Sequence, residues 1–452
     1  MQNLLRTQLN TPVRTISISK IGHLAWRVLG LALLVTMLGS CTIPAWLAQR
    51  YAFDLAVAGY EWKLVSWEVS ALREKFRAFV EQPADDVPPM EAVQLVRDYM
   101  ARSARIGEIE YELARRTRLS PSEPHEPPDV ELAAEMADLK AQQEKVRPLV
   151  EQIIERQVSS VLSQEDLANS MGWIWPPVLF TFVEPPKKLV VSRRNLIETI
   201  YSKMLAAELR LTAIEEIEGK IEQQRNSSAY ITEIGGLGAY PTIVVDEASL
   251  SWVLSTVAHE WTHNYLVFHP LGWYYFSSQD LTTINETVAE IVGNEVGDKI
   301  LKQYYPELVR EDEPDSPPST PDPPSFDFQL EMRITRQQVD RLLAEGKVEE
   351  AEAYMEARRL EFVANGYPLR VLNQAYFAFH GSYGTSPAST SPIGPKLERL
   401  RDLAPDLATF LKTVRTFTSV EDLDRTLNEW ETGGDVSHSV PQSSRELELA
   451  LP

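Results

Sequence analysis

The chain has 452 residues, enough for more than one ordinary domain and for a substantial hydrophobic core. Hydrophobic residues make up 44% of it and charged residues 24%, which is typical of a globular protein. The formal net charge is −21. We therefore expect no nucleic-acid partner, because phosphate binding depends on Lys and Arg.

Residues 1–48 resemble an export or anchoring segment. The first 40 residues carry four basic side chains and no acidic one. An apolar run from Val28 to Met37 follows, and Leu38-Gly39-Ser40-Cys41 after it resembles a bacterial lipobox, in which the cysteine is lipidated. Cys41 is the only cysteine of the chain, so an intramolecular disulfide is excluded.

An uncleaved membrane anchor is the alternative for the same segment. Apolar character continues to Ala48, and the 21 residues from Val28 to Ala48 would suffice for one membrane-spanning helix, which needs about 20. Both interpretations predict a protein tethered to the cell membrane, with its bulk on the extracytoplasmic side. The sequence leaves the choice between lipoprotein and anchor open.

Residues 49–170 are predicted to form a helical N-terminal region. Apolar side chains recur at three- and four-residue spacing over 52–118 and again over 130–165, with a proline-rich loop at 120–129 between them. The second helix is polar over much of its length. It could form a projecting coiled-coil arm, or a solvated helix that packs on one face.

Residues 171–311 are predicted to form the catalytic core, in which strands and helices alternate. Two β-like runs lie between Trp173 and Arg194, where Pro-Pro pairs interrupt the chain. The elements expected after them are a helix over 195–225, strands over Ala229–Ile234 and Tyr240–Val245, and helices over 249–268 and 283–303. The fold class expected is mainly α with a small β-sheet.

The remaining third of the chain is predicted to be helical. A proline-rich linker at 312–325 precedes a C-terminal region, 326–432, that we expect to complete the active-site cleft. Its expected elements are a helical hairpin that turns near Glu345-Gly346-Lys347 and further helices at 372–384, 395–415 and 419–431. Residues 433–452 are predicted to be a disordered tail.

The chemistry is concentrated in His259-Glu260-Trp261-Thr262-His263. Residues four apart lie on one face of a helix, so both imidazoles can reach one zinc ion. Glu260 then lies beside the metal and can accept a proton from water. The pattern HExxH can occur by chance, so its surroundings decide its meaning.

A second motif, Asn285-Glu286-Thr287-Val288-Ala289-Glu290, begins 22 residues after His263. Glu286 and Glu290 are again four apart, and Ala289 permits close approach of two helices. Zinc in hydrolases commonly has two His ligands and one carboxylate, with a fourth position for water. The expected site therefore holds one Zn²⁺ ion between His259, His263 and Glu286.

HEWTH followed by NETVAE resembles the gluzincins, the thermolysin-like and aminopeptidase-like zinc peptidases. There is a further likeness to predicted bacterial membrane-anchored aminopeptidases. The resemblance covers residues 229–300 and implies a zincin-like core in which Glu260 is the general base and Glu290 is a carboxylate behind a ligand histidine. The G-x-M-E-N exopeptidase signature is absent from the sequence, so endo- versus exopeptidase action stays open.

Peptide hydrolysis also needs a donor for the oxyanion. His380 and Tyr383, in the segment AYFAFHGSYG, are the candidates for this role, although an ordinary aromatic packing layer with a surface histidine would have the same sequence. Tyr274 and Tyr275 are interpreted as core or cleft wall. The strand Tyr240–Val245 could offer an exposed edge to an extended substrate, or be an ordinary buried strand.

The sequence therefore predicts a membrane-tethered zinc metallopeptidase that acts on peptide or protein substrates. Two alternatives remain. One is a zinc hydrolase of non-peptide amides or esters; the other is a non-catalytic envelope scaffold with a structural zinc. The sequence does not predict an oligomeric state.

Overall fold

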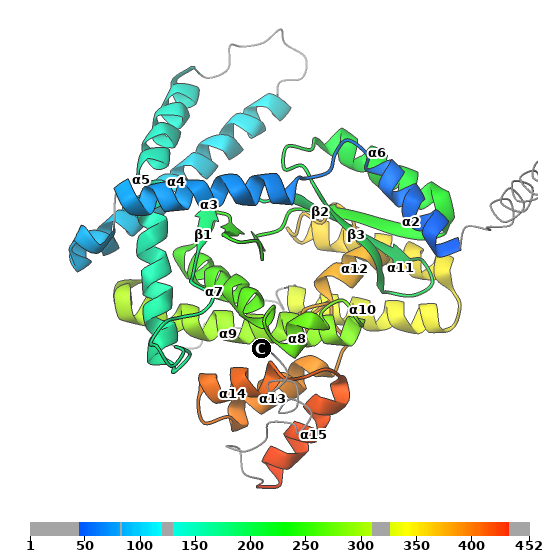
Figure 1. The fold of residues 1–452 in the computed structure, drawn as a ribbon. Coiled ribbons are helices and arrows are strands. Elements are labelled where there is room, and N and C mark those ends of the chain that lie inside the picture. The colour runs from blue at the N-terminus through cyan, green and yellow to red at the C-terminus, as the bar shows by residue number, and fades with distance from the viewer. Residues whose placement is uncertain (1–44, 82–83, 120–129, 310–325, 434–452) are drawn as a thin grey trace, which may run out of the picture. The chain divides into compact units, whose positions relative to one another are not determined.

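The computed structural model describes residues 45–81, 84–119, 130–309 and 326–433 (Figure 1). The described residues divide into two units, with the boundary between Leu55 and Ala56. The predicted lipidation site Cys41, the loop 120–129, the linker 312–325 and the tail from 434 onward lie outside the described residues. None of the helices in the described ranges is both long and apolar enough to cross a membrane.

The fold class predicted from the sequence is confirmed: the described residues are mainly helical and include two small sheets. The helices are α2 (Ala45–Ala56), α3 (Leu64–Glu81), α4 (Pro89–Leu119), α5 (Val130–Gln164), α6 (Leu211–Arg225), α7 (Leu250–Leu266), α8 (Pro270–Trp273), α9 (Gln279–Tyr304), α10 (Phe328–Ala344), α11 (Val348–Ala364), α12 (Gln374–His380), α13 (Ile393–Leu403), α14 (Leu407–Val414) and α15 (Val420–Glu431). Short 3-10 turns cover Ala84–Asp86 and Pro306–Leu308.

Each sheet has three strands. In the first, of order β1-β6-β5, β1 (Phe180–Phe182) pairs in parallel with β6 (Thr242–Val244), and β5 (Gly236–Leu237) pairs antiparallel with the other edge of β6. The second, of order β3-β2-β4, is antiparallel throughout and consists of β3 (Thr199–Leu205), β2 (Lys187–Arg193) and β4 (Ser227–Thr232). Helix α12 packs against β2 and β4 of this second sheet.

The helix predicted over 195–225 is wrong in its first half, where the chain forms β3 before α6 begins at Leu211. The segment TIYSKML contains β-branched and aromatic residues, and it pairs with β2 along its whole length. Strand pairing between distant segments therefore overrides the helical spacing read from sequence. Similarly, the single helix predicted over 395–415 is two helices, because Pro405 forces Ala404 into an extended conformation.

One hydrophobic core joins the predicted N-terminal, catalytic and C-terminal regions. Val158 of α5, Val257 of α7, Val292 of α9, Leu397 of α13 and Phe410 of α14 are all buried in it. A second core lies around α10, α11 and α12, with Phe362 at its centre. Helix α5 is therefore not a free arm: its C-terminal half, from about residue 143 on, is largely buried.

Candidate metal centre

Helix α7 presents the first motif. Its N-terminus is capped by Ser249, whose hydroxyl accepts a hydrogen bond of 3.3 Å from the backbone N–H of Trp252. The apolar residues Val253, Leu254 and Val257 bury one side of the helix in the main core. His259 and His263 follow one turn apart on the side that faces α9 and the cleft.

Helix α9 approaches α7 closely because its contact face carries small residues. Ala289, Gly293 and Gly297 recur at four-residue intervals and so lie on one face. A Cβ atom at position 293 would lie 2.7 Å from the backbone oxygen of Ser255 and 2.9 Å from Cβ of His259. Only glycine fits this contact, and the close approach brings Glu286, two turns earlier on α9, to the histidines.

The three predicted ligands converge. Nε2 of His259 lies 3.1 Å from Nε2 of His263, and Oε2 of Glu286 lies 3.7 Å and 3.4 Å from these two nitrogens. Donor atoms bound about 2.0 Å from a tetrahedral zinc ion lie about 3.3 Å from one another. The spacing and the N, N, O donor set therefore fit one zinc ion.

Asn285 determines which nitrogen of His263 faces the ligand triangle. Its Oδ1 atom lies 2.8 Å from Nδ1 of His263, so this nitrogen donates a proton to Asn285 and Nε2 is the nitrogen that faces the ligand triangle. The amide of Asn285 is held in turn by its Nδ2, which donates to the backbone oxygen of Leu271 at 3.3 Å. A hydrogen bond to the far nitrogen both orients a ligand imidazole and makes it a better donor.

The electrostatics of the site favour a cation. Burial alone would raise the pKa of the Glu286 carboxyl, but the neighbouring His263 and His259 outweigh burial and hold it well below its usual range. Burial alone would lower the pKa of His263, but Glu286 raises it to about 9. The second oxygen of Glu286 accepts a hydrogen bond from the hydroxyl of Tyr275. Tyr275 is therefore part of the site, and not only of the cleft wall as predicted.

Glu260 faces the same space from the next position on α7. Its side chain is buried, and burial raises the pKa of its carboxyl. The chain after β4 passes very near it: a Cβ atom at Gly236 would lie 2.6 Å from Oε1 of Glu260, and one at Gly238 would lie 3.3 Å from Oε2. These two glycines leave room for the carboxylate at the cleft.

The cleft is a cavity of about 720 Å³ that contains all three predicted ligands and Glu260 in its wall. Strand β5 forms part of this wall and is the edge strand of its sheet. The strand predicted over Tyr240–Val245 corresponds to β6, which is buried between β1 and β5. The second of the two interpretations of that strand, an ordinary buried strand, is therefore the one observed.

The residues predicted around the oxyanion also reach the cleft. His380 ends α12 and packs on Tyr376 at 4.2 Å between ring centroids, while the ring of Tyr383 lies 6.2 Å from that of His259. The negative charge of Glu286, together with burial, raises the pKa of the Tyr383 phenol well above its ordinary value. Burial lowers the pKa of His380 to about 4. Tyr383 therefore lies beside His259 and Glu286 and keeps its proton.

The turn that carries Tyr383 is fastened to α9. The backbone N–H of Gly384 donates to the hydroxyl of Thr287 at 2.9 Å, and Thr385 donates to Glu290. Glu290 thus borders the cleft and supports the Tyr383 turn, while the hydrogen bond to the far nitrogen of a ligand histidine comes from Asn285.

Comparison of the chain with known protein families, with curated proteins and with solved structures found no match. The contacts of Asn285 with His263, of Tyr275 with Glu286 and of Gly293 with α7 were not predicted from the sequence. The four-residue spacing of Ala289, Gly293 and Gly297 was a usable signal, whereas nothing in the sequence pairs Tyr275 with Glu286.

Proposed function

We propose that the protein is a zinc-dependent metallopeptidase of the gluzincin kind, tethered to the extracytoplasmic face of the cell membrane through its N-terminal segment. The observation that supports it most is the convergence of Nε2 of His259, Nε2 of His263 and Oε2 of Glu286 within 3.7 Å of one another, beside a buried glutamate. This is the donor set of hydrolytic zinc sites, in which three protein ligands leave a position for water.

His259, His263 and Glu286 would hold the metal. When bound, Zn²⁺ supplies a Lewis acid for the scissile carbonyl and makes water acidic enough to be activated near neutral pH. Asn285 keeps the proton of His263 on Nδ1, and Tyr275 occupies the second oxygen of Glu286, so both ligands are held in position before metal arrives.

Glu260 is the proposed general base. It lies one residue from His259 in the wall of the same cleft, and burial raises the pKa of its carboxyl above the ordinary value. A carboxyl group with a raised pKa can take a proton from water and pass it to the leaving amine. The narrow space next to Gly236 and Gly238 confines the carboxylate to the cleft side of α7.

Tyr383 is the proposed oxyanion donor. Its phenol remains protonated and is anchored through the neighbouring Gly384 and Thr385 to α9, the helix that carries Glu286. A fixed donor near the reacting carbonyl stabilises the charge that develops in the transition state. His380 lines the same cleft and is neutral near pH 7, so we assign it to the wall that receives substrate.

The test is metal content and peptide cleavage measured on the same purified full chain. We expect one zinc ion per chain, cleavage of a mixed peptide library, loss of cleavage after chelation and recovery on adding back one equivalent of zinc. Hydrolysis of simple esters or amides with no peptide cleaved would favour the non-peptide hydrolase. Zinc that is bound by four protein ligands, with no cleavage of any substrate, would favour the scaffold.

A further inference from the structure

Helix α3 buries a charged side chain and exposes several large apolar ones. Lys75 is only 8% exposed, whereas the neighbouring Phe76 is 71% exposed and Phe79 is 61% exposed. Further exposed apolar side chains on the same helix are Val65, Val69, Leu72 and Val80. A soluble surface seldom leaves so many large apolar side chains together in water, so this face is expected to be covered by a partner.

These side chains form one continuous stripe. Val65, Val69, Leu72, Phe76 and Phe79 follow one another at alternating spacings of four and three, which places them along a single face of the helix, and Val80 borders it. From Val65 to Val80 the stripe is about 22 Å long. We call these six residues the apolar stripe of α3. Arg73 and Arg77 each follow a stripe residue and lie along one side of it.

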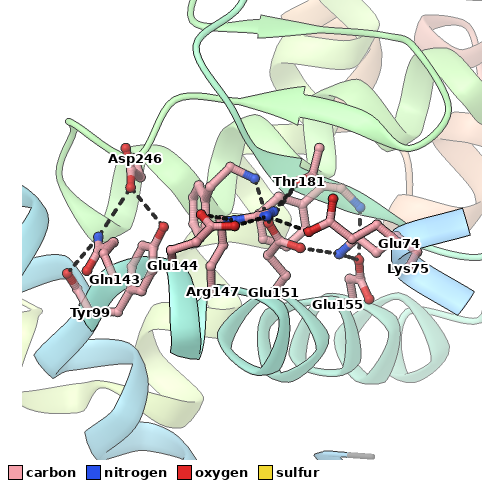
Figure 2. Close-up of polar contacts among 12 residues, drawn as sticks. Glu74, Lys75, Tyr99, Gln143, Glu144, Arg147, Glu151, Glu155, Thr181 and Asp246 are labelled. Carbon is pink, nitrogen blue, oxygen red and sulfur yellow. Dashed lines mark hydrogen bonds and ion pairs between the residues drawn. The ribbon is translucent and has the colours of Figure 1, made fainter. Parts of the chain in front are cut away.

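Buried ion pairs hold α3 in this orientation (Figure 2). Nζ of Lys75 lies 2.6 Å from Oε2 of Glu151 and 2.7 Å from Oε1 of Glu155, both on α5. Glu74, beside it, pairs with Arg147 of α5 at 2.5 Å. Burial alone would lower the pKa of Lys75, but the two carboxylates raise it, so the lysine is charged.

The carboxylates that receive Lys75 are themselves fixed by the first sheet. Oε1 of Glu151 accepts the backbone N–H of Phe182 at 2.8 Å, and Oε1 of Glu155 accepts that of Phe180 at 3.0 Å. They thus bond two amides of the edge strand β1. Rotation of α3 to bury its stripe would expose Lys75, remove the cation from Glu155 and leave Glu151 with Arg147 alone. Loss of one partner of a buried ion pair is strongly destabilising. The buried ion pairs of Lys75 with α5 therefore fix the outward direction of the stripe.

We propose that the apolar stripe of α3 lies on the surface of a lipid bilayer. The apolar sequence Val28–Ala48 ends 16 residues before Leu64, where α3 begins. Even when fully extended, a chain whose membrane anchor ends at Ala48 cannot carry Leu64 more than about 55 Å from the membrane, and a chain held by a lipid on Cys41, 23 residues before Leu64, cannot carry it more than about 80 Å. An amphipathic helix with this composition binds in the interface plane, with its apolar side among the acyl chains.

The side chains beside the stripe suit this position. Arg73 and Arg77 have long stems and charged ends, so they can lie along the apolar boundary while their guanidinium groups reach the lipid phosphates. The bilayer contact would add a second attachment to the N-terminal one and restrict the orientation of the folded part. It rests on the N-terminal membrane attachment of the proposed function and is independent of the proposed zinc chemistry.

The test measures the depth of α3 in the membrane, because the N-terminal segment would bind vesicles in every variant. The full chain with Cys41→Ser, which keeps the apolar segment Val28–Ala48 as its attachment, would carry one new cysteine. This cysteine would be either Phe76→Cys in the stripe or Ser70→Cys on another face of α3, each labelled with an environment-sensitive fluorophore. Both proteins would be reconstituted in phosphatidylcholine vesicles with or without a nitroxide on the acyl chains. Both positions are exposed, so neither substitution should disturb folding.

We expect acyl-chain nitroxide to quench the label at position 76 at least three-fold more strongly than the label at position 70, and aqueous iodide to show the reverse order. Equal quenching at the two positions would overturn the proposal. So would a label at position 76 that is shielded from both quenchers but shows energy transfer between chains, because a second copy would then cover the stripe. A Phe79→Ser variant with the label at 76 should lose part of the lipid quenching while it keeps its melting temperature.

Discussion

Asn285 and His263 form a hydrogen bond of 2.8 Å between Oδ1 and Nδ1, and Asn285 is the residue immediately before Glu286 on α9. One turn of α9 therefore supplies both the proposed metal ligand Glu286 and the group that orients the proposed ligand His263 on α7. The position and the tautomer of His263 thus depend on the α7–α9 contact, which also places the Glu286 carboxylate. Any change that shifts α9 against α7 should affect both together.

Replacing Asn285 with Ala should weaken zinc binding roughly 10- to 100-fold, because the far nitrogen of His263 loses its acceptor. Zinc affinity measured by competition with a chelator dye would check this. Asn294→Ala is the matched control, since Asn294 lies on α9 and lines the same cleft but is exposed. Unchanged affinity in Asn285→Ala would mean that His263 is oriented by other contacts.

Replacing Glu260 with Gln should leave the zinc content at wild-type level and lower kcat roughly 10²- to 10⁴-fold, because the general base is removed while the ligands remain. Metal analysis and peptide cleavage on the same preparation would measure both. Glu233→Gln is a suitable control, as Glu233 also borders the cleft and pairs with Lys187 at 2.9 Å. Near-normal turnover in the Glu260 variant would contradict the proposed mechanism.

Gly293→Ala should reduce both stability and zinc affinity, because the added Cβ meets the backbone of α7 at 2.7 Å and must push the helices apart. The expected loss is about 1–3 kcal/mol of unfolding free energy. Gly219→Ala on α6 is the opposite control: its Cβ would meet no atom within 4 Å, so it should stabilise by about 0.5–1 kcal/mol. Thermal or urea unfolding of both variants would decide, and equal effects would argue against a tight α7–α9 contact.

Tyr383→Phe should lower kcat roughly 10²-fold with little change in zinc content, because only the donor hydroxyl is lost. The control is Tyr274→Phe, which changes an exposed tyrosine of the loop before α9 and should behave like wild type. Steady-state kinetics with one cleaved peptide would separate them. A large rise in KM with unchanged kcat would instead assign Tyr383 to substrate binding.

His380 should make the protein less stable in acid. Its pKa is lowered to about 4 by burial, so between the ordinary value of about 6.5 and pH 4 the unfolded chain takes a proton that the folded protein refuses. The contribution of neutral His380 to the free energy of unfolding is therefore fully present above pH 6.5, and it decreases as the pH falls toward 4. Between pH 7 and pH 5, wild type should lose about 2 kcal/mol more than His380→Gln in urea unfolding with chelator present. Parallel losses would show that His380 is accessible to protons in the folded state.

The sequence alone was sufficient for features that depend on local spacing. His259 and His263 share a face because they are four residues apart in a helix, and the same rule places Glu286 and Glu290 together. The long helix at 130–165 and the hairpin that turns at Gly346 were predicted for the same reason, and α5, α10 and α11 confirm them. Here the information lies within a few turns of one element.

Features that depend on contacts between distant segments were decided by the tertiary structure. Pairing with β2 makes β3 a strand despite its helical spacing. The hydroxyl of Tyr275 donates to Glu286 because the turn after α8 lies against α9. The ion pairs of Lys75 with α5 direct Phe76 outward. The amphipathic pattern of α3 by itself would predict the opposite, with Phe76 buried and Lys75 exposed. The spacing of the proposed zinc ligands within each helix was therefore predictable from local periodicity, whereas the groups that position them were not, because their partners lie on other elements.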